Sequence, residues 1–147
     1  MTNCIEGVDT PHIVPGEYNA ACISYELKYG FNNQPKIYLS FKIEMESEED
    51  IVLIKYFNLK KITDLSKSEF IVGIKSDLFR DTVLLLKSKK TVKGFDSNDF
   101  INAYLGKVFI VDVISVTNKS NKQSMDKELW YSKVDFIKEY IPVPHLR

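Results

Sequence analysis

The sequence of 147 residues predicts a mainly β domain, a small barrel of five strands with a helical insertion between the third and fourth strands. Three observations support this prediction. Segments rich in β-branched and aromatic residues recur along the chain, and one of them alternates strictly between apolar and polar residues. Between the third and fourth segments the apolar spacing becomes helical. No linker-like stretch interrupts this order, so we expect a single domain over residues 1–147.

The first three predicted strands follow a polar lead-in over residues 1–12 that we expect to be flexible. In chain order they are a strand from Glu17 to Leu27, a turn over Gly30–Pro35, a strand from Lys36 to Glu44 and a strand from Ile51 to Leu59. The middle strand alternates between apolar and polar residues, which predicts a buried face made by Ile37, Leu39, Phe41 and Ile43.

The insertion carries the helical signals. Residues 60–75 have no clear period, and we interpret them as a loop with a short helix after Asp64. Ser76 is a good N-cap for the helix that follows, and Lys87–Lys90 supply the positive charge that a helix C-terminus favours. A shorter helix is predicted to start at Ser97–Asp99 and to end at Gly106, where glycine takes the left-handed conformation.

The last two predicted strands, Gly106–Val116 and Leu129–Ile137, enclose a long polar loop over Thr117–Glu128. Loops of this length on compact domains are often functional or disordered. Prolines at positions 142 and 144 end the ordered structure, so we expect residues 142–147 to be flexible.

Five strands with a helix between the third and the fourth are typical of the OB-fold, a small Greek-key barrel. OB-folds bind oligonucleotides through strands 2 and 3 and through the loops that join strands 1 and 2 and strands 4 and 5. Those loops correspond here to Lys28–Pro35 and Thr117–Glu128. An antiparallel α+β domain with the same order of elements is the alternative, and the sequence leaves both open.

Three short segments resemble single-stranded-DNA-binding proteins of phages and plasmids. They are Pro15–Ala20 at the start of the first strand, Leu105–Phe109 at the start of the fourth and Tyr131–Val134 in the fifth. The likeness covers most of the chain in element order, although each motif is short. It implies an OB-fold and a role in protecting single strands during replication or recombination of a mobile element.

Charge is spread unevenly, although the formal net charge is zero. Residues 1–50 hold 3 Lys against 9 Asp or Glu, whereas residues 51–147 hold 17 basic residues against 11 acidic ones. Of the 20 basic residues only Arg80 and Arg147 are arginines. Because Lys suits phosphate and Arg suits the reading of bases, a nucleic-acid ligand would be bound with little sequence preference. An AT-rich genome explains the abundance of Lys equally well.

Single-strand binding needs aromatic faces for bases and cations for phosphates, and the predicted strands pair Tyr with Lys repeatedly. The candidate residues on strands are Lys36, Tyr38, Lys42, Lys55, Tyr56, Tyr131 and Lys133. The alternative for each is an ordinary outward residue of a sheet. The 117–128 loop adds Lys119, Lys122 and Lys127 as backbone contacts, and the alternative for them is an ordinary solvated loop. Trp130 alternates with Val134 and Phe136, so it belongs to the core or to the binding surface, and Phe31 is a stacking residue or a lid.

No catalytic motif, phosphate loop, metal-ligand spacing or cofactor motif is found, so we expect a protein that is not an enzyme and binds no metal or cofactor. No apolar run of membrane-spanning length and no signal peptide are present, which favours a cytoplasmic protein with Cys4 and Cys22 as free thiols. Single-stranded DNA is the expected partner, with RNA and homo-oligomers left open. The alternative function is a small protein-interaction module or inhibitor that uses the same sheet.

Overall fold

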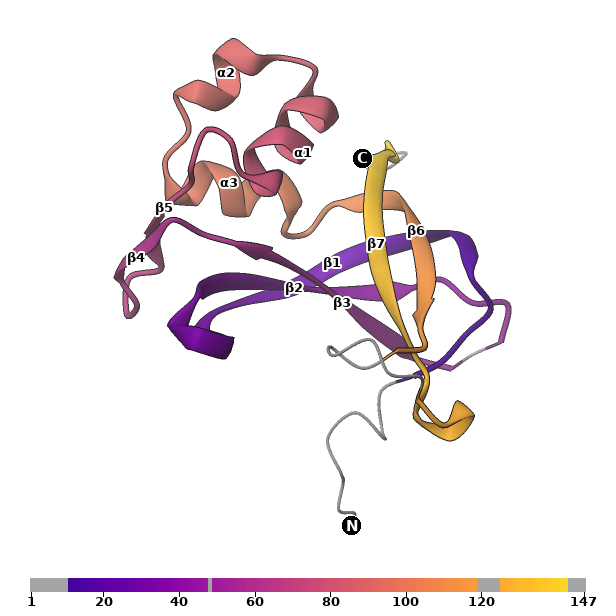
Figure 1. The fold of residues 1–147 in the computed structure, drawn as a ribbon. Helices are drawn as coiled ribbons and strands as arrows, with labels where there is room; N and C mark the ends of the chain where they lie inside the picture. The colour runs from indigo at the N-terminus through magenta and orange to yellow at the C-terminus, as the bar shows by residue number, and fades with distance from the viewer. Residues whose placement is uncertain (1–10, 48, 119–124, 143–147) are drawn as a thin grey trace.

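The computed structural model describes residues 11–47, 49–118 and 125–142. Five antiparallel strands form one sheet in the order β3-β2-β1-β6-β7, and a hairpin and three helices pack at one end of it (Figure 1). The sheet strands are β1 (Gly16–Tyr29), β2 (Pro35–Ile43), β3 (Ile51–Asn58), β6 (Val108–Val116) and β7 (Tyr131–Tyr140). The mainly β class predicted from the sequence is therefore confirmed.

The long central strand β1 joins the two halves of the sheet. It pairs with β6 over Gly16–Ala21 and with β2 over Ala20–Tyr29, and the register shifts by one residue at Ile23. An extra residue of this kind bends a strand and increases its twist. One strand of 14 residues can therefore serve both β2 and β6 while the sheet curves.

The sheet does not close into the predicted barrel. Its edge strands β3 and β7 approach to within 8 Å between Cα atoms, yet no backbone ladder joins them. Two hydrogen bonds engage the β7 edge instead of a ladder, and one of them comes from β3. The Lys55 ammonium donates to the carbonyl oxygen of Asp135 at 2.9 Å, and the amide of Ser132 donates to the carbonyl of Pro11 at 2.9 Å. Part of the β7 edge is thus already bonded to the segment that precedes β1.

Residues 60–75 contain a hairpin over 61–71 and no helix, so the predicted loop with a short helix is wrong. The hairpin consists of β4 (Lys61–Asp64) and β5 (Glu69–Ile71), with Ile62 paired to Phe70. The Asp64 carboxylate accepts hydrogen bonds from the Lys67 amide and the Ser66 hydroxyl, which holds the turn. Strands of three and four residues are too short for a periodic signal in the sequence.

The helices are α1 (Asp77–Leu86), α2 (Lys89–Lys93) and α3 (Ser97–Tyr104). The Ser76 cap is confirmed, because its side chain accepts from the Phe79 amide. Lys87 ends α1 in the left-handed conformation, and Ser88 caps α2, so Lys89 and Lys90 begin a second helix instead of closing the first. Among the described residues no helix is long and apolar enough to cross a membrane.

The core lies on the inner face of the curved sheet and continues under the hairpin and the helices at one end. The predicted inward face of β2 is confirmed, since Ile37, Leu39, Phe41 and Ile43 are all at most 2% exposed. Phe41 and Tyr104 pack against the Phe109 ring, with centroids 5.9 and 5.8 Å from it. The buried hydroxyl of Tyr104 is paired with Thr82 at 2.9 Å. Burial raises the pKa of the free Cys22 thiol to about 11. Cys4, most of the lead-in 1–12 and residues 143–147 lie outside the described residues.

Candidate nucleic-acid interface

Two tyrosines stand opposite each other on the outer face of the sheet. Because Ile37 and Leu39 are buried, the alternation of β2 turns Lys36 and Tyr38 outward. The register sets Tyr38 opposite Tyr56 of β3 and Glu26 of β1. It also sets Lys36 between Asn58 of β3 and Lys28 of β1. We call this set the tyrosine–lysine cluster; its members are Lys28, Lys36, Tyr38, Tyr56 and Asn58.

The cluster has close internal geometry. The two tyrosine rings have centroids 5.7 Å apart and are tilted by 39°, and Tyr56 is 47% exposed. The Lys36 ammonium lies 4.0 Å from the centroid of Tyr56 and donates to the Asn58 amide oxygen at 2.8 Å. The Lys28 ammonium lies 4.7 Å from the centroid of Tyr38, with the Glu26 carboxylate 3.8 Å away. Two aromatic faces and two cations thus meet in one exposed patch, in which Lys28 is paired with a carboxylate and Lys36, among the described residues, is not.

Sequence reasoning missed Lys28. The signal was present, because Lys28 and Lys36 flank the Gly30–Pro35 turn at positions that become cross-strand neighbours. Gly30 leaves room for the Lys36 side chain at the start of this turn, since a Cβ there would lie 2.6 Å from Cε of Lys36. A larger residue would displace the lysine from its place over Tyr56.

The turn between β1 and β2 presents Phe31. Asn32 and Asn33 both have positive φ, a conformation that asparagine adopts more readily than most residues, and Phe31 is 86% exposed. Of the two roles left open by the sequence, a lid over the core is therefore excluded. Phe31 projects at the end of the strands that carry the tyrosine–lysine cluster.

Lys42 lies on the same face of β2 but away from the tyrosines. It stands opposite Val52 and Ala21, and its ammonium is 3.3 Å from the carboxylate of Asp50. Six residues separate it from Lys36, which is about 20 Å along a strand. The structure does not bring Lys42 into the cluster.

Lys55 was a candidate because it is adjacent to Tyr56 in sequence, but neighbours along a strand point to opposite sides. Its side chain lies on the same side as the buried residues Leu53 and Phe57. The ammonium is 4.8 Å from the Phe57 centroid, and burial lowers the pKa of Lys55. Lys55 closes the gap between β3 and β7 and is not part of the outer patch.

On β7, Tyr131 and Lys133 lie on the outer side as predicted, opposite Val116 and Ile114. Phe136 was expected to be buried, but it stands opposite Asp112 on that outer side, and Ile137 is buried in its place. The cause is an extra residue in β7, which shifts the register between Val134 and Phe136. Lys133 also lines a hollow together with Tyr56 and Asn58, so it adjoins the cluster.

Trp130 is half-buried and lies outside the main core. Its indole N–H donates to the Met125 carbonyl at 3.1 Å, and the His12 ring meets it edge-on with centroids 5.9 Å apart. Lys127, in the 3₁₀ turn η2 (Lys127–Leu129), holds its ammonium 5.7 Å from the indole. Lys119 and Lys122 lie outside the described residues.

No metal site accompanies the cluster: the described ranges hold no group of three or more His, Cys, Asp or Glu side chains that could bind an ion. The likeness to single-stranded-DNA-binding proteins stays a prediction from three short segments, because the chain matches no protein-family model, no curated protein and no solved structure.

Proposed function

We propose that this protein binds single-stranded nucleic acid, DNA in the first place, with little sequence preference and without catalysing a reaction. The observation that carries the proposal is the pair of Tyr38 and Tyr56 on the outer face of the sheet, flanked by the ammonium groups of Lys28 and Lys36. Every base has a π-face, so stacking on tyrosine tolerates any sequence, and it contributes roughly 1–3 kcal/mol per base.

The cations of the cluster favour a sequence-tolerant mode of binding. A lysine contacts phosphate as a point charge, whereas bidentate reading of bases uses arginine. In the part of the chain that the structure describes, Arg80 is the sole arginine, and it is paired with Asp77 at 3.3 Å and Asp81 at 3.1 Å. Phosphate contacts would therefore come from lysines.

The strand order supports the same proposal. The central strand β1 pairs with β2 on one side and with β6, the fourth strand of the sheet, on the other. We interpret this pairing as that of a five-stranded, partly open Greek-key barrel of OB type. Under that interpretation β2 and β3 are the ligand-binding strands, and they are the strands that carry Tyr38 and Tyr56. Action in replication or recombination of a mobile element is the biological role that the family resemblance suggests.

The test is fluorescence anisotropy with labelled oligo-dT, duplex DNA and oligo-U at two salt concentrations. We expect oligo-dT to bind more tightly than duplex, since a duplex hides its base faces. Tyr56→Ala should weaken oligo-dT binding, and Tyr56→Phe, which keeps the ring, should restore it. Equal affinity for duplex, or no binding of oligo-dT at low salt, contradicts the proposal.

A protein partner is the second candidate, because apolar side chains are exposed near the cluster. Ile54 of β3 is 37% exposed on the same face as Tyr56, and Ile23 at the bulge of β1 is 48% exposed. Ile54→Lys separates the two functions. It should strengthen the binding of a polyanion and disrupt docking of an apolar protein surface.

A further inference from the structure

The open seam between β3 and β7 contains a hollow of about 190 Å³. Two lysines line it from opposite strands, Lys55 from β3 and Lys133 from β7, and Asp77 of α1 lines it from the helical side. Tyr56 and Asn58, which belong to the tyrosine–lysine cluster, line it too. The hollow is therefore continuous with the outer patch.

The charges around the hollow leave two cations without an anionic partner. Neither Lys55 nor Lys133 has a carboxylate within 4.0 Å among the residues that the structure describes. The Lys55 ammonium donates to one acceptor, the Asp135 carbonyl, and an ammonium has three N–H groups. The carboxylates of Asp77 and Asp81 are both paired with Arg80.

The two lysines also act on each other. Burial is the main cause that lowers the pKa of Lys55, and the positive charge of Lys133 lowers it further, while the carboxylates of Asp81, Asp135 and Asp77 raise it. An anion in the hollow would accept the free N–H groups of Lys55, and its attraction to the two lysines would have to exceed its repulsion by the carboxylates of Asp81, Asp135 and Asp77. A phosphate carries acceptor oxygens on all sides and suits such a pair of point charges.

We propose that the hollow at the β3–β7 seam binds a backbone phosphate of the single strand, next to the base stacked on Tyr56, with Lys133 as the main contact. This inference depends on the proposed function. Tyr38 and Tyr56 lie on neighbouring strands, so a ligand that stacks on both crosses the sheet from β2 to β3. The next feature in that direction is the edge of β3 and the hollow behind it.

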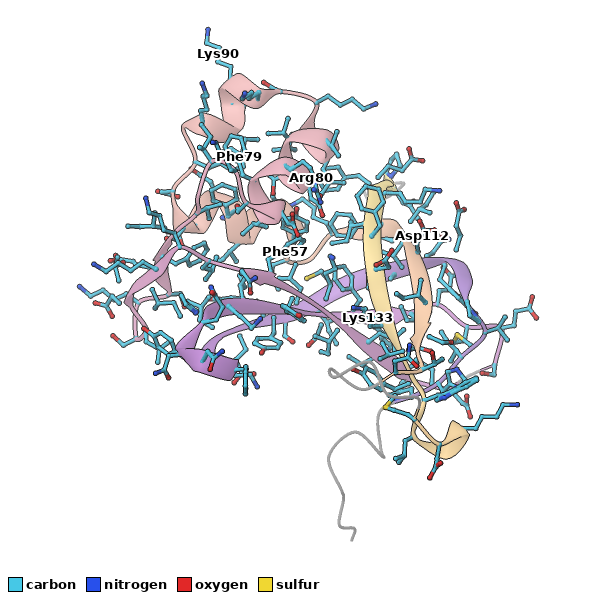
Figure 2. All side chains as sticks on the ribbon, in the orientation of Figure 1. Phe57, Phe79, Arg80, Lys90, Asp112 and Lys133 are labelled. Carbon is cyan, nitrogen blue, oxygen red and sulfur yellow. The ribbon has the colours of Figure 1, made fainter. Side chains whose placement is uncertain are left out.

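The test measures the affinity for oligo-dT against salt concentration for the wild type and for Lys133→Gln. Lys90→Gln is the matched control, because Lys90 projects from α2 at the far end of the molecule from Lys133 (Figure 2). Loss of one phosphate contact should flatten the slope of log K against log salt by about 0.7. The control should leave the slope unchanged.

Asp77→Asn gives a second, independent readout, since Arg80 keeps its partner Asp81. Removal of this negative charge from the wall of the hollow should tighten binding roughly two- to fivefold, the size expected of one exposed charge. A decrease or no change in affinity counts against the subsite.

The outcomes separate the two proposals. If Lys133→Gln keeps the wild-type slope while Tyr56→Ala weakens binding, the seam subsite is wrong and the proposed function stands. If Lys133→Gln and Lys90→Gln flatten the slope equally, the effect is one of overall charge and the subsite is again wrong. If the wild type binds no oligo-dT at low salt, the proposed function itself fails.

Discussion

The two ends of the outer sheet face have opposite chemistry. At one end, Lys28 and Lys36 hold their ammonium groups over Tyr38 and Tyr56. At the other end, Lys42 is paired with Asp50, and a hollow of about 440 Å³ has three carboxylates among its seven lining residues. Its acidic members are Glu17, Glu44 and Glu46. The same strand, β2, thus runs from an aromatic, cationic end to an acidic one.

This difference restricts the path of a polyanion. Under the proposed function, the carboxylates at the Glu44 end of β2 would repel phosphates and would disfavour a path of the single strand along the whole of β2. The open directions are across the sheet, toward the seam at β7, and around the turn that carries Phe31. The contrast also shows that charge in sequence is a poor guide to charge in space. Lys28 and Lys36 both come from residues 1–50, the half with the excess of acid.

Of the substitutions that test this difference between the two ends, one at the aromatic end should change the affinity for oligo-dT most. Tyr38→Ala should weaken binding of oligo-dT by roughly 1–3 kcal/mol, the contribution of one stacked base. The thermal midpoint should change little, because truncation of an outward tyrosine opens no core cavity. Anisotropy titration and thermal unfolding, monitored by circular dichroism, measure the two quantities on the same samples.

Tyr38→Phe is the matched control and should bind nearly as the wild type does. The opposite pattern, a large drop in thermal midpoint with affinity unchanged, would mean that the tyrosine pair serves the fold. The patch would then be structural, and the binding surface would have to lie elsewhere.

A smaller effect is expected when the acidic end is reversed. Glu44→Lys combined with Glu46→Lys removes the repulsion and extends the cationic face along β2. Affinity for oligo-dT should rise roughly two- to fivefold for each charge, and more for an oligonucleotide long enough to reach both ends. Length dependence measured at one salt concentration checks this. An increase that is equal for short and long oligonucleotides would indicate a general field effect and no extended path.

Part of this arrangement could be predicted from the sequence. The alternation of β2 placed Lys36 and Tyr38 outward, because four buried apolar residues fix the face of the strand. The same argument gave Tyr131 and Lys133 on β7. The alternation argument failed at Phe136, because one extra residue in β7 exchanges the inward and outward positions that follow it. Nothing in the composition of a strand indicates such a bulge.

Other parts depend on contacts that a linear pattern does not contain. Lys55 has a charged side chain in a strand, which suggests exposure, but it fills the gap left by an open sheet edge. The sequence predicted the strands that became β3 and β7. It did not predict that the edge of β7 would be hydrogen-bonded to Pro11. The hairpin β4–β5 is held by a turn at Asp64 and by the Ser97 hydroxyl, which bonds both the amide and the carbonyl of Phe70.

The smallest expected effect is on the salt dependence of binding, and it tests the difference between the two ends with two lysines on one face of one strand. Lys36→Gln should flatten the salt dependence of oligo-dT binding by about 0.7, whereas Lys42→Gln should leave it unchanged. Lys36 has no carboxylate within 4.0 Å in the described part of the chain, so its charge is free for a phosphate, while Lys42 is already paired with Asp50. If Lys42→Gln flattens the slope as much as Lys36→Gln, the ligand reaches the acidic end. The direction across the sheet, and with it the route to the seam, would then be wrong.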